Sequence, residues 1–232
     1  MQGDPRLRGD DEEGAGMTVG RTGMTKVGVA QGWKKNVILP YMDTSILDKA
    51  IVFAVNAHSG AERKGKGFPY IVHPMEAVSI AATMTNDQEL LAAAVLHDTV
   101  EDTEVTLKEI EREFGKRIAR LVEAESDIVF EGKSRAESWR LRKEETIGRL
   151  SVAPNEVKIV ALADKLSNIR AIYRDYQSIG DKVWDLFCVK DVASHEWHFR
   201  GLARALSSLK GTFAYNEFEE LISKLFDKSG SR

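Results

Sequence analysis

Apolar side chains recur at helical spacing from residue 43 onward, and no stretch alternates apolar and polar residues over the length of a strand. Asp43 or Thr44 can cap a first helix that carries Ile46 and Ile51. Pro74 favours the first position of the next helix, where its missing N–H costs nothing. The pattern therefore predicts an all-α fold with no sheet.

The most apolar of the predicted helices includes "LLAAAVL" at residues 90–96. After it, Thr106 and Glu109 have the spacing of a capping box, and Gly115 is expected to end the helix that they begin. Pro154 opens the longest helical stretch, "NEVKIVALADKLSNIRAIYRDY". Two more helices are predicted around residues 191–210 and 214–227.

Residues 1–40 differ from the rest of the chain, because they are rich in Gly, Asp and Arg and lack periodic apolar positions. Such a composition buries too little surface to offset the entropy lost on ordering. We expect a flexible N-terminal tail over residues 1–40 and a single domain over residues 41–232.

Charge and cysteine content narrow the functional classes. The 232 residues include 33 Lys and Arg against 36 Asp and Glu, a net charge of −3, which argues against a duplex nucleic-acid binder. The single cysteine, Cys188, permits no internal disulfide and fits a reducing compartment. No apolar run approaches the roughly 20 residues of a membrane span, and the N-terminus lacks a signal-peptide core. We expect a soluble cytoplasmic protein without a membrane partner, and the sequence leaves its oligomeric state open.

Four polar residues stand beside apolar helical stretches. Asp164 follows "VKIVALA", and His97 and Asp98 follow Leu96 directly. A bare carboxylate buried there would cost several kcal/mol. Each residue alone could be a paired or hydrogen-bonded core residue, but a divalent cation accounts for all three. His73, just before Pro74, is the fourth candidate ligand, and the mixed N/O set suits Mn²⁺, Fe²⁺ or Zn²⁺ better than Ca²⁺.

Two further carboxylates follow this pair, with Glu101 four residues after His97 and Asp102 four after Asp98. If the helix continues, each lies on the face of its predecessor. They could orient a metal-bound water and carry its proton, or they could belong to a solvated acidic loop. Asn168, four residues after Asp164, could bond a ligand's hydroxyl or base, or be an ordinary buried amide.

Basic and aromatic residues give weaker signals. Arg63, Lys64 and Lys66 lie in the glycine-containing loop "ERKGKG", which could meet phosphates. A second basic cluster consists of Arg140, Arg142 and Lys143. We interpret the remaining histidines and one tryptophan as structural or helix-packing residues: His58, His195, His198 and Trp197.

The segments "RKGKGFPYIVHP", "AAVLHDTVEDTEVT" and "ALADKLSNIRAI" occur in this order. Together they resemble the HD-domain hydrolases of the RelA/SpoT superfamily, and most of all the stand-alone small alarmone hydrolases. The resemblance runs from about Asp43 to about Tyr176 and is weaker beyond. Residues 177–200 match poorly, and we expect them to shape substrate choice.

The resemblance implies an all-α HD-domain helical bundle that cleaves guanosine 3′,5′-bis(diphosphate), (p)ppGpp, at the 3′ position to pyrophosphate and GDP or GTP. It implies one Mn²⁺ per chain, with the ligands His73, His97, Asp98 and Asp164. It also implies a water-activating pair, Glu101 and Asp102, and substrate contacts from Arg63, Lys64 and Asn168.

Two other functions remain open from the sequence. One keeps the site and changes the substrate to another nucleotide such as NADPH. The other is a nucleotide-binding regulator without turnover, against which the intact Glu101–Asp102 pair speaks. A purely structural reading would require every one of these polar residues to be a coincidence.

Overall fold

The structure is a computed structural model that describes residues 42–63, 65–126, 130 and 132–227. The predicted flexible tail, residues 1–40, and Lys64 lie outside the described residues. Met42–Arg232 form one compact unit. The all-α prediction is confirmed, because the described part of this unit is built from helices and its one β-type pairing is an isolated bridge between Glu62 and Pro69.

The helices follow one another through short connections. Their bounds, in chain order, are α1 Ser45–Ala57, α2 Val72–Ala81, α3 Gln88–Leu96, α4 Thr99–Asp102, α5 Leu107–Phe114, α6 Lys116–Glu125, α7 Trp139–Val152, α8 Asn155–Ile179, the 3-10 helix η1 Gly180–Leu186, α9 Val192–Ala205, the 3-10 helix η2 Ser207–Leu209 and α10 Phe213–Phe226.

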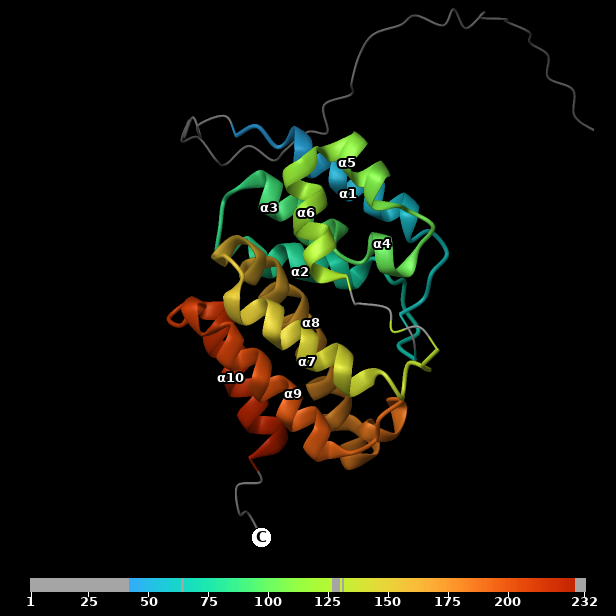
Figure 1. Ribbon diagram of the computed structural model, residues 1–232, viewed down its shortest axis with the longest axis vertical. Coiled ribbons are helices and arrows are strands. Elements are labelled where there is room, and N and C mark those ends of the chain that lie inside the picture. The colour runs from blue at the N-terminus through green and yellow to red at the C-terminus, as the bar shows by residue number, and fades with distance from the viewer. Residues whose placement is uncertain (1–41, 64, 127–129, 131, 228–232) are drawn as a thin grey trace, which may run out of the picture. The chain divides into compact units, whose positions relative to one another are not determined.

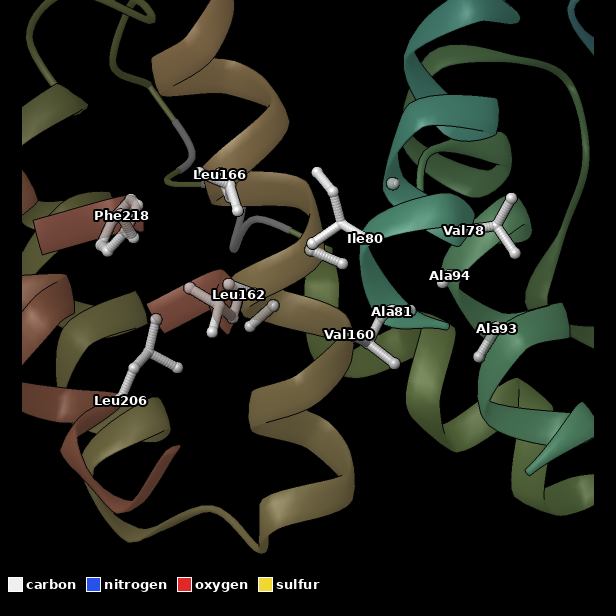
Figure 2. Close-up of a cluster of buried hydrophobic side chains, with 14 of the residues drawn as sticks. Val78, Ile80, Ala81, Ala93, Ala94, Val160, Leu162, Leu166, Leu206 and Phe218 are labelled. Carbon is white, nitrogen blue, oxygen red and sulfur yellow. The ribbon is translucent and has the colours of Figure 1, made fainter. Parts of the chain in front are cut away.

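Helix α8 is the centre of the bundle (Figure 1). It packs against α2, α3 and α6, and also against α10 and η1. Five consecutive residues of this helix, Val160 to Asp164, are buried, so neighbours cover it on every side. Figure 2 shows Leu162 and Leu166 of α8 between Ile80 of α2 and Phe218 of α10. A polar side chain in this middle segment of α8, such as that of Asp164, is therefore buried.

The capping signals read from the sequence lie at the helix ends where they were predicted. The Thr106 side chain accepts from the Glu109 amide while Glu109 accepts from the Thr106 amide, so the predicted capping box begins α5. Gly115 ends that helix with φ of 86°, a left-handed conformation that glycine adopts without a Cβ clash. Pro154 caps α8, and α9 and α10 occupy the two predicted C-terminal stretches.

One helix boundary differs from the prediction, and the continuous helix that would have placed Glu101 on the face of His97 does not form. Helix α2 begins at Val72, so Pro74 is its third residue and His73 lies inside the first turn instead of before the helix. Proline is tolerated there because the first four amides of a helix have no partner within it. Helix α3 ends at Leu96, and the short α4 begins at Thr99, so no continuous helix connects His97 with Glu101.

None of the helices in the described ranges is both long and apolar enough to cross a membrane. Even α8, the longest at 25 residues, carries charged residues along its length.

Candidate metal centre

Three helical regions bring four side chains to one point. His73 comes from the first turn of α2, His97 and Asp98 from the link between α3 and α4, and Asp164 from the middle of α8. The Nε2 atoms of the two histidines lie 3.3 Å apart. Oδ2 of Asp98 is 3.3 Å from His73 Nε2 and 3.0 Å from His97 Nε2. Oδ1 of Asp164 is 3.1 Å and 3.5 Å from the same two nitrogens.

The donor atoms fit a divalent cation. His73, His97 and Asp164 each offer one ligand atom within 4.8 Å of the others, and all three residues are buried. The Asp98 oxygen adds a fourth donor at similar distances. Two imidazoles and two carboxylates form a mixed N/O set of the kind that first-row transition metals accept.

Hydrogen bonds behind the imidazoles orient their Nε2 atoms toward this point. His97 Nδ1 lies 2.8 Å from the carbonyl oxygen of Ala94, which can only accept, so Nδ1 carries the hydrogen. His73 Nδ1 lies 2.8 Å from Ser167 Oγ, whose own hydrogen is donated to Glu76 Oε2 at 2.7 Å. Each neutral ring therefore presents the Nε2 lone pair, the arrangement that metal-bound histidines use.

The charges of the cluster hold one another in their ionised forms. Burial would lower the pKa of His97, but Asp98 and Asp164 overcome it and raise that pKa well above its usual value. Burial would likewise raise the pKa of Asp98, yet His97 and His73 hold it well below the usual range. A proton on His97 thus occupies the role that a cation would take, so proton and metal compete for the site.

A lysine and a glutamate stand behind Asp164. Lys165 Nζ donates to Asp164 Oδ2 at 2.5 Å and lies 3.4 Å from Glu125 Oε2. Burial raises the pKa of Glu125, while Lys165 opposes that rise. Because Lys165 engages Oδ2, the other oxygen of Asp164 faces the histidines.

Glu101 and Asp102 lie in the short helix α4, and both are exposed. The Glu101 carboxylate accepts from Arg135 Nη2 at 2.9 Å. The Tyr70 hydroxyl donates to Asp98 Oδ2 at 2.6 Å. Burial raises the pKa of this hydroxyl, and the neighbouring carboxylates of Asp98 and Asp102 raise it further. Asp102 is therefore connected to the cluster through Tyr70, whereas Glu101 is held at the outer side of α4.

Known proteins share this chain's pattern. The model of the HD domain matches residues 50–188. The chain belongs to the HD-domain family. This confirms the resemblance found in the sequence, and the buried cluster of His73, His97 and Asp164 lies within the matched residues.

Two curated relatives of this HD-domain protein differ in length. It is 32% identical over 190 residues to guanosine-3′,5′-bis(diphosphate) 3′-pyrophosphohydrolase MESH1 of Danio rerio, covering 81% of this chain and 96% of that protein. It is 36% identical over 141 residues to GTP pyrophosphokinase rsh of Brucella ovis, covering 57% of this chain. The match spans only 18% of the length of that Brucella protein.

A solved structure gives the same fold. A metazoan orthologue of SpoT, described as hydrolysing ppGpp and acting in starvation responses, superposes with a TM-score of 0.61 at 21% identity over 79% of this chain and 97% of its own. At that identity the likeness establishes the fold of the HD domain alone.

Two of the three predicted substrate-binding residues, Arg63 and Asn168, contact each other at α8. Arg63 Nη2 donates to Asn168 Oδ1 at 2.6 Å, and Asn168 Nδ2 donates to Asp164 Oδ1 at 2.5 Å. Lys64 lies outside the described residues. Lys66 forms an ion pair with Asp175, which lies on α8. The chain from Arg63 through Asn168 to Asp164 places a guanidinium beside the metal centre.

The second basic cluster has structural contacts. Arg142 is buried and donates to the Arg135 carbonyl at 3.0 Å. Arg140 pairs with Glu144, and its guanidinium lies 3.2 Å from the centre of the Trp197 ring. This contact agrees with a packing role for Trp197.

Sequence reasoning missed two residues that contact the ligands. Tyr70 lies three residues before His73 in "PYIVHP", and Lys165 directly follows Asp164. The Tyr70 contact depends on how the loop before α2 meets the link between α3 and α4. Lys165 neighbours Asp164 in α8, so its place next to a predicted ligand could have drawn attention to it.

Proposed function

We propose that this chain is a divalent-metal-dependent guanosine-3′,5′-bis(diphosphate) 3′-pyrophosphohydrolase. One observation carries the proposal. The buried cluster of His73, His97, Asp98 and Asp164 occurs in a chain that is 32% identical over nearly the whole length of a protein named for this activity. The products are pyrophosphate and GDP or GTP.

The reaction is a hydrolysis at phosphorus. Water adds to the phosphorus bonded to the 3′ oxygen, the P–O3′ bond breaks, pyrophosphate leaves, and the 3′ oxygen takes up a proton. His73, His97, Asp98 and Asp164 would hold one divalent cation, proposed to be Mn²⁺. A bound cation of this kind supplies Lewis-acid stabilisation of phosphate charge and lowers the pKa of a water.

The carboxylates of α4 are proposed to handle the protons of this step. Asp102 reaches the ligand set through Tyr70, and Glu101 lies in the same helical turn. An exposed carboxylate next to a metal centre can take a proton from water and pass it to solvent or to the leaving oxygen. The contact of Glu101 with Arg135 holds its side chain in place in the absence of substrate.

Arg63 and Asn168 are proposed to bind the nucleotide, together with Lys64. Their mutual hydrogen bond is 2.6 Å, and binding would exchange it for bonds to the substrate. A guanidinium can bond phosphate in a bidentate manner or stack on a base, and an amide can both donate and accept. We place the protein in the cytoplasm with a small-molecule nucleotide as its partner and no duplex nucleic acid or membrane.

A substrate panel tests the proposal. The purified full chain is loaded with Mn²⁺ and offered guanosine tetra- and pentaphosphate, NADPH and simple nucleoside monophosphates, with products identified by mass. We expect pyrophosphate and GDP or GTP from the first two at a rate far above the others. The Asp164→Ala variant is the matched blank for contaminating phosphatases. Preferential release of inorganic phosphate from NADPH would overturn the assignment.

A further inference from the structure

Tyr70 is in contact with several of the site's functional groups. It lies in the loop before α2, and its hydroxyl donates to Asp98 Oδ2 at 2.6 Å. That same oxygen lies 3.3 Å from His73 Nε2 and 3.0 Å from His97 Nε2. Asp102 is the second carboxylate neighbour of the Tyr70 hydroxyl, since burial, Asp98 and Asp102 together raise the pKa of that hydroxyl. Tyr70 thus connects a candidate metal ligand with a candidate proton-transfer group.

The distance between the Tyr70 hydroxyl and Asp98 Oδ2 identifies a strong hydrogen bond. A hydroxyl donating to a carboxylate at 2.5–2.7 Å is charge-assisted and roughly twice as strong as a neutral bond. The phenol has one hydrogen, so it can donate to only one of its two carboxylate neighbours at a time. The 2.6 Å distance assigns that hydrogen to Asp98. A change in one carboxylate is therefore transmitted to the other through a single hydroxyl.

The ring of Tyr70 is fixed on several sides. His58 stacks on it with ring centres 4.8 Å apart and planes at 30°. The guanidinium of Arg63 lies 5.3 Å from the ring centre, and His73 meets it edge-on at 6.0 Å. His58 is 3% exposed, and neither of its ring nitrogens has a hydrogen-bond partner among the described residues. A buried imidazole with no polar bond contributes mainly through its face, and that face lies on Tyr70.

We propose that Tyr70 is a positioning residue of this site, which fixes the inward-facing oxygen of Asp98 and couples it to Asp102, with His58 holding its ring. The inference deepens the proposed function and relies on it for the activity readout. Metal affinity, measured with Mn²⁺ alone, does not depend on the identity of the substrate.

The Tyr70→Phe variant tests the hydroxyl and keeps the ring. We expect its Kd for Mn²⁺, measured by calorimetry, to rise about 10-fold, and kcat at saturating Mn²⁺ to fall roughly 10- to 100-fold, as for other groups that orient metal ligands. KM for the nucleotide should stay the same, because Arg63 keeps its ring contact.

Tyr215→Phe is the matched control. The Tyr215 hydroxyl also contacts two oxygens, the Ala203 carbonyl at 2.8 Å and Glu219 Oε1 at 3.1 Å, but it does so between α9 and α10. Losing it should lower the melting temperature and leave Mn²⁺ affinity and kcat as in the wild type. If Tyr70→Phe behaves like Tyr215→Phe in both quantities, the proposal is wrong.

Combining Tyr70→Phe with Asp102→Asn measures the coupling between the two residues, and a purely structural role of Tyr70 would produce no such coupling. If Tyr70 acts through Asp102, the loss in kcat from Tyr70→Phe should shrink when it is made in an Asp102→Asn background. Full additivity of the two losses would show that the hydroxyl does not couple these groups.

A pair of His58 variants keeps the test decisive should Tyr70→Phe not fold. His58→Phe preserves an aromatic face against Tyr70, whereas His58→Leu removes it. We expect His58→Leu to lose more kcat and more Mn²⁺ affinity than His58→Phe. Equal behaviour of the two variants would refute the role of the stacked ring. If no variant and no wild-type sample cleaves (p)ppGpp, the proposed function fails while the Mn²⁺ data still decide the role of Tyr70.

Discussion

Two pairs of buried histidines in this bundle have opposite surroundings. His73 and His97 are 3% and 2% exposed, and His195 and His198 are 4% and 7% exposed. The first pair faces Asp98 and Asp164. Among the described residues, the second pair lies among aromatic rings, with Trp184 stacked on His195 at 5.0 Å and Trp139 edge-on to His198 at 5.8 Å.

The pKa values of His97, His195 and His198 shift in directions that follow from these surroundings. Burial lowers the pKa of His198 well below its usual value and lowers that of His195. At His97, burial also acts to lower the pKa, but the attraction of Asp98 and Asp164 is stronger and raises it. His195 Nε2 is also occupied by the Val189 carbonyl at 2.7 Å. Burial alone therefore does not mark a metal site, whereas converging carboxylates and free Nε2 lone pairs do.

The largest expected effect comes from removing a carboxylate of the first pair. Asp98→Ala leaves His97 without its nearest charged partner and the cluster with three donors. We expect bound metal, read by elemental analysis, and hydrolytic activity to be lost together, with kcat down roughly 10³-fold or more, since metal-ion stabilisation of phosphate charge contributes several kcal/mol. Stoichiometric metal with wild-type turnover in this variant would remove Asp98 from the ligand set.

A smaller effect is expected from removing a carboxylate that transfers a proton and does not bind the metal. Glu101→Ala should keep the metal and slow turnover roughly 10²-fold, the usual size of a general acid–base contribution. Its exposed pair with Arg135 contributes little to stability.

Glu104→Ala, an exposed acid two residues after Asp102, is the matched control for general charge effects. Equal rates for the two variants would place the proton-transfer role elsewhere, with Asp102 the next candidate.

The sequence predicts the fold and much of the ligand cluster for a physical reason. Helical periodicity and caps are local, and they placed the capping box at Thr106 and the long central helix after Pro154. The placement of Asp164 in an apolar helix is also readable, because an ionised side chain among buried residues requires a partner. The start of α2 differs from the prediction, because the helix begins two residues before Pro74, at Val72.

Contacts between helices could not be predicted from the sequence. The bond from Tyr70 to Asp98 spans 28 residues, and that from Arg63 to Asn168 spans 105. Neither distance follows from a spacing rule, since each depends on the angle at which the loop before α2 meets its neighbours. The shared face of Glu101 and His97 depended on a continuous helix, and that condition is not met, because α3 ends at Leu96 and α4 begins at Thr99.

The pH dependence of stability should distinguish His97 from the second histidine pair. In chelator, the raised pKa of His97 stabilises the fold below about pH 6.5, and this contribution is lost as the pH rises through the raised value. The lowered pKa values of Asp98 and Asp164 act at the other end, since their stabilisation is lost only as the pH falls below the usual carboxyl range.

Metal binding requires the deprotonated imidazole, so its stabilisation grows with pH. At about 100 times Kd, Mn²⁺ should add about 2.7 kcal/mol. We therefore expect the gap in melting temperature between Mn²⁺-loaded and chelator-treated protein to widen from about pH 6 to about pH 9. A gap independent of pH would mean that the cation does not displace a proton from this cluster.

The smallest effect is expected at the second pair. His198→Phe removes a ring nitrogen, Nδ1, that has no hydrogen-bond partner among the described residues, and keeps an aromatic face against Trp139. Replacing an unsatisfied buried polar group with an apolar one of similar shape is nearly neutral or stabilising by about 1 kcal/mol. Bound metal and kcat should equal those of the wild type, while His97→Phe, at equal burial, should lose both. If His198→Phe also lost metal, the carboxylates would not be what separates the two pairs, and the aromatic pair would have to reach the centre by another route.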